Sequence, residues 1–252
     1  MGETIVFTSG KGGVGKTTTI ANIGAGLSQL DKKVVMLDTD MGLRNLDVVM
    51  GLEDRINYNL LDLLENRCRL NQALIRDKRF PNLYMIPASL KNIPMEKYEK
   101  AFEILMNHLK QEFDFCLIDC PAGIDQGFRF ATSVADRAIL LTTPHVSAIK
   151  DASRVLQLLN GTKIPKVELI INGYDEKLVR KKYMLSKEDI SELFDIPILG
   201  TIPHDDKVIV SQNRGIPVVT MRSKTTRQFM YLSEQMITEI NLEEEECVYD
   251  IS

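Results

Sequence analysis

The amino-acid sequence predicts an α/β fold: a single doubly wound, mostly parallel sheet with helices on both faces. Short runs that are apolar throughout alternate with segments of helical period along the whole chain. Strands that are apolar at every position are buried on both faces, as in parallel sheets covered by helices. No linker rich in glycine, serine or proline interrupts the alternation, and no internal repeat is present. We therefore predict one domain over residues 1–240 and an acidic tail over residues 241–252.

The first two elements flank a glycine-rich turn. Residues 4–8 (TIVFT) form an apolar run typical of a buried strand, and residues 17–30 place Ile20, Ile23 and Leu27 on one helical face. The later elements continue the alternation. Strands are expected at residues 34–37, 83–86, 115–118, 138–142, 167–171 and 198–202, and helices at residues 95–112, 147–159, 186–194 and 224–240.

The composition indicates an ordinary soluble protein. The chain has 252 residues, of which 44% are hydrophobic and 26% charged, with a net charge of −4. This charge gives no general reason to bind nucleic acid or acidic lipid. No apolar run reaches the length of a spanning helix and no signal peptide precedes the first strand, so we expect a cytoplasmic location. Cys116 and Cys120 fall on and just after a predicted strand, where thiols act as small hydrophobes.

A phosphate-binding loop follows the first strand. Residues 10–17 (GKGGVGKT) match the pattern G-x-x-x-x-G-K-[ST] in full, between a predicted strand and a predicted helix. Glycines let backbone N–H groups turn toward phosphates, and the helix N-terminus adds a positive dipole end. Lys16 is expected to reach the β- and γ-phosphates, and Thr17 to bind Mg²⁺. The expected nucleotide-binding residues of this segment are Gly10, Lys11, Gly12, Gly13, Val14, Gly15, Lys16, Thr17 and Thr18.

Three acids lie at predicted strand ends. Asp38 ends the second strand, Asp40 follows two residues later, and Asp119 follows residues 115–118. Ligands of open parallel sheets bind beyond the carboxyl ends of the strands, and carboxylates there suit hydrated Mg²⁺. We therefore predict Mg²⁺-site roles for Thr17, Asp38 and Asp119. Asp40 is the candidate that positions the attacking water, which makes Lys11, Lys16 and Asp40 the predicted catalytic residues.

These motifs resemble the MinD/ParA family of ATPases with a deviant Walker A loop. The resemblance rests on the early lysine, Lys11, and on residues 38–52 (DTDMGLRNLDVVMGL), 70–79 (LNQALIRDKR), 119–124 (DCPAGI) and 213–218 (NRGIPV). It covers nearly all of residues 2–240 and is most specific for the division-site branch of the family. In that family the early lysine reaches the partner's phosphates across a dimer that encloses ATP.

The resemblance also implies partners and a function. It implies a switch in septum-site determination: a homodimer forms with ATP, recruits a MinC-like division inhibitor, and dissociates after slow hydrolysis stimulated by a MinE-like protein or an adaptor. It further implies that Asn172, Pro203 and Asp205 hold the adenine. The guanine-binding pattern N-K-x-D is absent at residues 172–175 (NGYD), which favours ATP over GTP.

The sequence departs from the family pattern at three places. Relatives end in a basic amphipathic helix that lies on the membrane, whereas residues 241–252 contain five acids and no base. Such a tail is repelled by anionic lipid. Either a targeting helix is missing from this sequence, so that the ATP form would lie at the inner face of the cell membrane, or the chain does not bind membrane by that route. Gly173 and His145 replace an arginine and a glutamate that are common in relatives.

Three alternatives remain open. A ParA-type or flagellar-type positioning ATPase shares the loop, and the basic run at residues 177–182 (KLVRKK) could contact DNA, although a solvated helix face explains it better. A metal-centre reductase or scaffold would need a ligating cysteine pair, for which Cys116 and Cys120 are poorly placed. A module that binds ATP without turnover is the third alternative, but Lys16, Thr17 and Asp40 leave hydrolysis intact.

Overall fold

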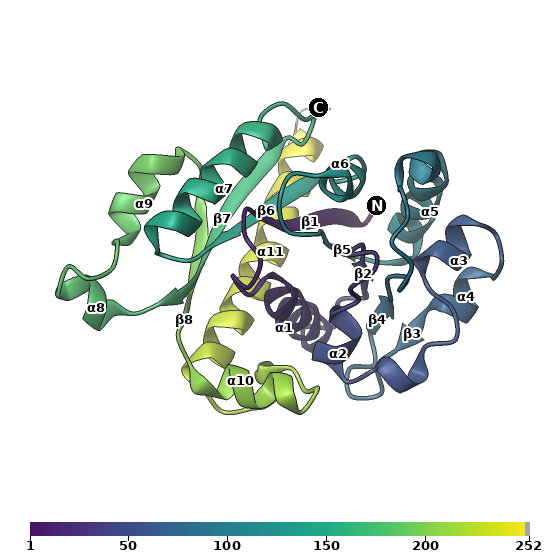
Figure 1. Cartoon of the computed structure of the whole chain (residues 1–252), viewed down its shortest axis with the longest axis horizontal. Coiled ribbons are helices and arrows are strands. Elements are labelled where there is room, and N and C mark those ends of the chain that lie inside the picture. The colour runs from purple at the N-terminus through teal and green to yellow at the C-terminus, as the bar shows by residue number, and fades with distance from the viewer. Residues whose placement is uncertain (250–252) are drawn as a thin grey trace.

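The computed structural model describes the backbone of residues 1–249 and the side chains of residues 1–238. Its centre is an eight-stranded sheet in the order β3-β4-β2-β5-β1-β6-β7-β8 (Figure 1). Every neighbouring pair is parallel except β3 and β4, so the predicted doubly wound fold is confirmed. The strands are β1 (Glu3–Ser9), β2 (Val34–Asp38), β3 (Ile75–Arg76), β4 (Leu83–Ile86), β5 (Phe115–Asp119), β6 (Arg137–Thr142), β7 (Lys166–Tyr174) and β8 (Ile198–Pro203).

Helices cover both faces of the sheet. One hydrophobic cluster joins the strands to α1 (Lys16–Gln29), α2 (Leu46–Met50) and α11 (Lys224–Tyr249). The opposite cluster joins them to α3 (Leu60–Leu64), α5 (Glu99–Glu112), α6 (Gln126–Thr132), α7 (Val146–Leu159) and α9 (Lys187–Phe194). Successive residues of β1 alternate between the clusters, Ile5 and Phe7 in the first and Val6 in the second. In Figure 1, α1 and α2 lie toward the bottom of the view and α6 and α7 toward the top.

The sequence located the long elements but missed the short ones. The unpredicted pieces are β3, α2, α3, α4 (Leu70–Ala73), α6, α8 (Glu176–Arg180), α10 (Asp206–Asn213) and two short 3₁₀ turns at Glu53–Arg55 and Val218–Thr220. A further 3₁₀ turn, Glu96–Tyr98, forms the start of the helix predicted over residues 95–112. Elements of one or two turns are too short to display a hydrophobic period, and packing rather than propensity stabilises them.

The C-terminal boundary differs from the prediction. Helix α11 continues to Tyr249 instead of ending at residue 240. Residues 250–252, and the side chains of the predicted tail over residues 241–252, lie outside the described part of the chain. The tail therefore stays a prediction. No described helix is long and apolar enough to cross a membrane.

The parallel arrangement places three loop segments together at the carboxyl ends of the central strands. β1, β2 and β5 are neighbours, and their carboxyl ends lead into the phosphate loop, the Asp38–Asp40 turn and the loop after Asp119. Asp38 and Asp119 are register partners on adjacent strands. Open parallel sheets bind ligands beyond the carboxyl ends of their strands, so the fold brings the predicted site residues together.

Candidate functional site

The phosphate loop has the backbone shape that its glycines predict. Gly13 and Gly15 have φ values of 80° and 94°, in the left-handed region that favours glycine. A Cβ added at Gly12 or Gly13 would meet no atom within 4 Å, so the loop borders open space. Val14 is buried in the core. A Cβ at Gly15 would lie 2.2 Å from Nδ2 of Asn172, which comes from the end of β7.

Lys16 lies beneath this loop in an ion pair. Its Nζ donates to Oδ1 of Asp119, and both side chains are buried. Burial alone lowers the pKa of Lys16, but the charge and hydrogen bond of Asp119, with a smaller contribution from Asp38, raise it above its ordinary value. The lysine is therefore a charged group held at the carboxyl ends of β2 and β5.

Asp38 is a fully buried carboxyl group. Its Oδ1 accepts from the N–H of Asp40 at 2.9 Å, and its Oδ2 accepts from those of Asn45 and Leu46 at 3.1 Å each. Burial, followed by the charge of Asp119, raises its pKa to about 7. The three hydrogen bonds favour the carboxylate and oppose this rise. A cation placed between the two aspartates would relieve their repulsion.

Asp40 lies beside the same charges. It is half-buried, and burial raises its pKa, while Lys16 lowers and Asp119 raises it. The preceding residue, Thr39, attaches this turn to β5 because its hydroxyl donates to the carbonyl oxygen of Asp119 at 2.8 Å. Sequence reasoning missed Thr39, since nothing local indicates which strand lies next to it.

The second lysine of the loop has the opposite environment. The Lys11 side chain is exposed and forms no ion pair with the described residues, while its carbonyl oxygen accepts from the Ser9 hydroxyl at 3.1 Å. Thr17, the predicted Mg²⁺ ligand, is half-buried in the first turn of α1. The loop therefore offers one lysine to the interior and one to the exterior.

The predicted adenine residues lie at the ends of β7 and β8. Asn172 Nδ2 donates to the carbonyl oxygen of Val14 at 2.7 Å, and its Oδ1 accepts from the N–H of Gly173 at 2.9 Å. Pro203 ends β8. Asp205 caps α10 by accepting from the N–H of Lys207 at 3.0 Å. Asn172 thus contacts the phosphate loop directly, a contact that the sequence did not predict, and its adenine role stays a prediction.

Asp205 also ties the β8 loop to the last helix. Its Oδ2 accepts from the Thr225 hydroxyl at 3.0 Å. Partial burial raises the pKa of Asp205, but its hydrogen bonds with Lys207 and Thr225, among others, hold it below the ordinary value. The residue is consequently ionised and structurally engaged, as a helix cap.

Other sequence features are explained by local structure. Cys116 and Cys120 are buried, and burial raises the pKa of each thiol to about 12, so both behave as small hydrophobes. Gly173 has a φ of 72°, in the left-handed region that suits glycine and disfavours a residue with a Cβ such as arginine. His145 is exposed next to the start of α7. Among the described residues, no group of three or more histidine, cysteine or acidic side chains is arranged to hold a metal.

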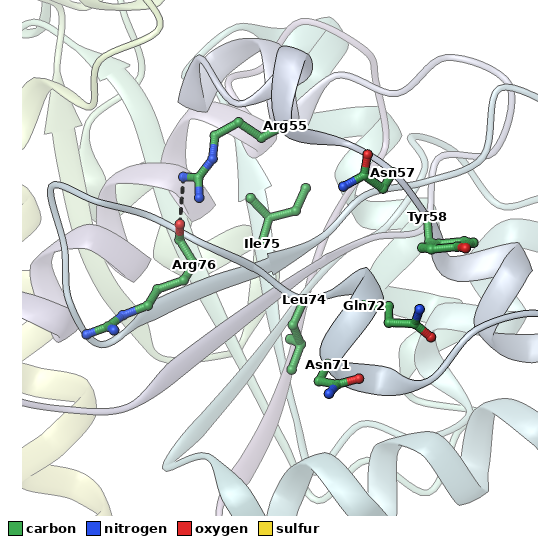
Figure 2. A pocket seen from close by; sticks show the side chains of 8 residues that line it. All are labelled: Arg55, Asn57, Tyr58, Asn71, Gln72, Leu74, Ile75 and Arg76. Carbon is green, nitrogen blue, oxygen red and sulfur yellow. Dashed lines mark hydrogen bonds between the residues drawn. The ribbon is translucent and has the colours of Figure 1, made fainter.

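A separate polar pocket of about 730 Å³ lies at the β3 edge of the sheet (Figure 2). None of the predicted site residues lines it. Its lining residues are Arg55, Asn57, Tyr58, Asn71, Gln72, Leu74, Ile75 and Arg76. Arg55 donates to the carbonyl oxygen of Arg76 at 2.7 Å, as the dashed line in Figure 2 marks.

A parallel sheet whose first strand leads into a complete phosphate loop, with a buried lysine paired to a strand-end aspartate, defines a P-loop nucleotide hydrolase. A family model described as an AAA domain matches residues 2–170. The septum site-determining protein MinD of Synechocystis is 48% identical, over 87% of this chain and 82% of the relative. The chain belongs to the MinD family of septum site-determining ATPases.

Solved structures agree with this membership. A MinC:MinD cell division complex from Aquifex aeolicus matches with a TM-score of 0.86 and 41% identity, covering 94% of this chain and 96% of that chain. The septum site-determining protein MinD of Pyrococcus horikoshii, complexed with Mg-ADP, matches with a TM-score of 0.83 and 30% identity, covering 94% and 96%. One of these relatives is thus seen in a complex with MinC, and the other is seen with Mg-ADP.

Proposed function

We propose that this chain hydrolyses ATP with Mg²⁺, forms a homodimer in the ATP state, and in that state recruits a MinC-like inhibitor of division. The observation that carries the proposal is the contrast between its two loop lysines. Lys16 is buried against Asp119, whereas Lys11 is exposed with no ion-pair partner among the described residues. A cation held outward at the mouth of a phosphate loop is suited to phosphates bound by a second copy.

The donor set fits a magnesium nucleotide. Gly12 and Gly13 leave open space at the loop, and a phosphate there would meet backbone N–H groups and the N-terminus of α1. Thr17, Asp38 and Asp119 would hold hydrated Mg²⁺ through oxygen atoms, which this ion prefers. Once bound, Mg²⁺ would neutralise charge on the phosphates.

Each charged residue then has a distinct task. Lys16 would exchange its carboxylate partner, Asp119, for phosphate oxygens, which leaves Asp119 free to accept from a water of the ion. Asp40, half-buried beside the same charges, would orient the attacking water. Phosphoryl transfer depends mainly on such positioning and charge stabilisation, so these groups suffice for slow hydrolysis. We propose that a MinE-like or adaptor protein accelerates it.

The inhibitor partner is supported by the Aquifex relative, which forms a MinC:MinD complex and is 41% identical to this chain. A positioning ATPase that binds DNA is disfavoured by the net charge of −4 and by the contacts of the basic run, where Arg180 pairs with Glu176 on α8. We therefore propose no specific nucleic-acid partner. We propose that attachment to the inner face of the cell membrane would depend on a basic amphipathic targeting segment.

Size-exclusion chromatography with light scattering tests the switch. Asp40→Ala, which should bind ATP without hydrolysing it, is expected to be dimeric with ATP and Mg²⁺ and monomeric with ADP and Mg²⁺. Adding Lys11→Ala should abolish the dimer. Lys78→Ala, at another exposed lysine, serves as the matched control and should not affect it. A Lys11→Ala protein that still dimerises would contradict the proposed role of Lys11.

The partner is tested with the same samples. A MinC homologue from the same genome, immobilised on a biosensor, should capture Asp40→Ala with ATP but not with ADP. Equal capture in both nucleotide states would show that recruitment does not depend on the switch. No capture in either state would refute the inhibitor assignment while leaving ATP hydrolysis untouched.

A further inference from the structure

A side chain from α10 contacts the first turn of the phosphate helix. Gln212 Nε2 donates to the hydroxyl oxygen of Thr18 at 2.5 Å, joining residues that are 194 positions apart. Thr18 is only 7% exposed, and Gln212 is half-buried. We propose that Gln212 is a positioning residue, which aims the Thr18 hydroxyl proton at a phosphate of the bound nucleoside diphosphate or triphosphate.

The chemistry of a hydroxyl group explains this role. A threonine hydroxyl has one proton to donate and two lone pairs. The amide of Gln212 occupies a lone pair of Thr18, so the single proton must be donated to another group. Threonines inside helices commonly donate to the carbonyl four residues back, as Thr19 does to Gly15 at 2.8 Å.

For Thr18, the corresponding acceptor receives a hydrogen bond from another side chain. The carbonyl four residues before it belongs to Val14, and this oxygen accepts from Nδ2 of Asn172 at 2.7 Å. Two carboxamides, from β7 and α10, therefore act on the same turn. Asn172 takes one of the two lone pairs of the Val14 oxygen, and Gln212 takes one of the two on the hydroxyl oxygen. Among the described residues, the Thr18 hydroxyl donates to no protein acceptor. The Thr18 proton is left available to an anionic ligand at the loop.

Helix α10 is itself held at both ends. At its start, Asp205 accepts from the N–H of Lys207 and from the Thr225 hydroxyl. Just beyond its end, the carbonyl oxygen of Gly215 accepts from Nη1 of Arg79 at 2.7 Å. The backbone there is in close contact with α2, since a Cβ on Gly215 would lie 2.6 Å from the Cα of Gly51.

The consequence is a physical connection between two parts of the site. α10 begins at the Pro203–Asp205 loop, the predicted adenine side, and carries Gln212 to the phosphate helix. A displacement of the adenine loop would move the carboxamide that orients Thr18. We infer that Gln212 makes phosphate binding depend on how this loop is placed. This role rests on the nucleotide binding proposed above.

Calorimetric titration of the full chain with ADP and Mg²⁺ tests the proposal without measuring turnover. Thr18→Val should weaken ADP binding about tenfold, because it removes a hydrogen bond to a charged group. Gln212→Leu should weaken it about threefold, because it frees the hydroxyl to rotate. Gln212→Glu should be worse than Gln212→Leu, because its carboxylate accepts the Thr18 proton and adds negative charge. Asn213→Ala, at an exposed neighbour on α10, is the control and should bind like the parent.

A double-mutant cycle separates positioning from general support. In the Thr18→Val background, Gln212→Leu should have no further effect on ADP affinity, because the proton that it orients is gone. Equal effects in both backgrounds, or unchanged affinity in Gln212→Glu, would overturn the role of Gln212. If the unaltered chain itself fails to bind ADP, the proposed function fails, a result that is distinguishable from loss of coupling in a chain that binds.

Discussion

Replacing Lys16 with alanine would remove the cation from a buried group of charges. The Lys16 side chain is 9% exposed and that of Asp119 2% exposed, and Asp38, the register partner of Asp119, is fully buried. The substitution leaves two neighbouring carboxylates without a cation. Removing one partner of a buried ion pair costs about 3–5 kcal/mol. We expect the nucleotide-free variant to lose about that much unfolding free energy at about pH 8, and to lose nucleotide binding.

Urea denaturation followed by circular dichroism measures the loss. Lys11→Ala is the matched control, since it removes an exposed lysine from the same loop and should change the unfolding free energy by less than about 0.5 kcal/mol. Acidification should restore part of the stability of Lys16→Ala, because Asp38, which already has a pKa of about 7, becomes neutral. If Lys16→Ala is as stable as Lys11→Ala at every pH, the Lys16–Asp119 ion pair does not contribute to the unfolding free energy.

Three further outcomes follow from other groups. The pKa of Asp38 is about 7 in the folded chain, against an ordinary value of 3.8, so ionising this group destabilises the fold. The contribution of Asp38 to the unfolding free energy of the nucleotide-free chain should be greatest below pH 3.8 and fall by at most about 4 kcal/mol as the pH rises from 3.8 through 7. Urea titrations at a series of pH values should show this fall in the parent and not in Asp38→Asn. Glu168→Leu removes the β7 carboxylate from the buried Arg137, whose Nη1 still lies 3.8 Å from Glu3, and should cost about 3 kcal/mol. Arg137→Met in the same chain should restore much of this loss, and a double variant no more stable than Glu168→Leu would argue against the pair. Gly173→Ala should cost about 1 kcal/mol in thermal unfolding, because alanine is strained at a φ of 72° even though a Cβ meets no neighbour; unchanged stability would show that the turn relaxes.

The sequence by itself determined the class of fold and the chemical parts of the site. A strand, a glycine-rich loop and a helix follow one another along the chain, so the loop around Lys16 could be predicted without knowledge of any distant residue. The acids at the ends of β2 and β5 were predictable for the same reason, since each follows an apolar run. Apolar periodicity and turn chemistry are local properties, and they indicate the type and approximate position of the longer elements.

Only the tertiary structure decided which of these groups meet. Lys16 and Asp119 are 103 residues apart, and their pairing depends on β1 and β5 being neighbours in the sheet. The raised pKa of Asp38 arises from burial and from the strand beside it. The contact of Gln212 with Thr18 depends on a short helix that has no clear period. Strand order and helix docking are set by the sum of many weak contacts between distant residues, and no local pattern records them.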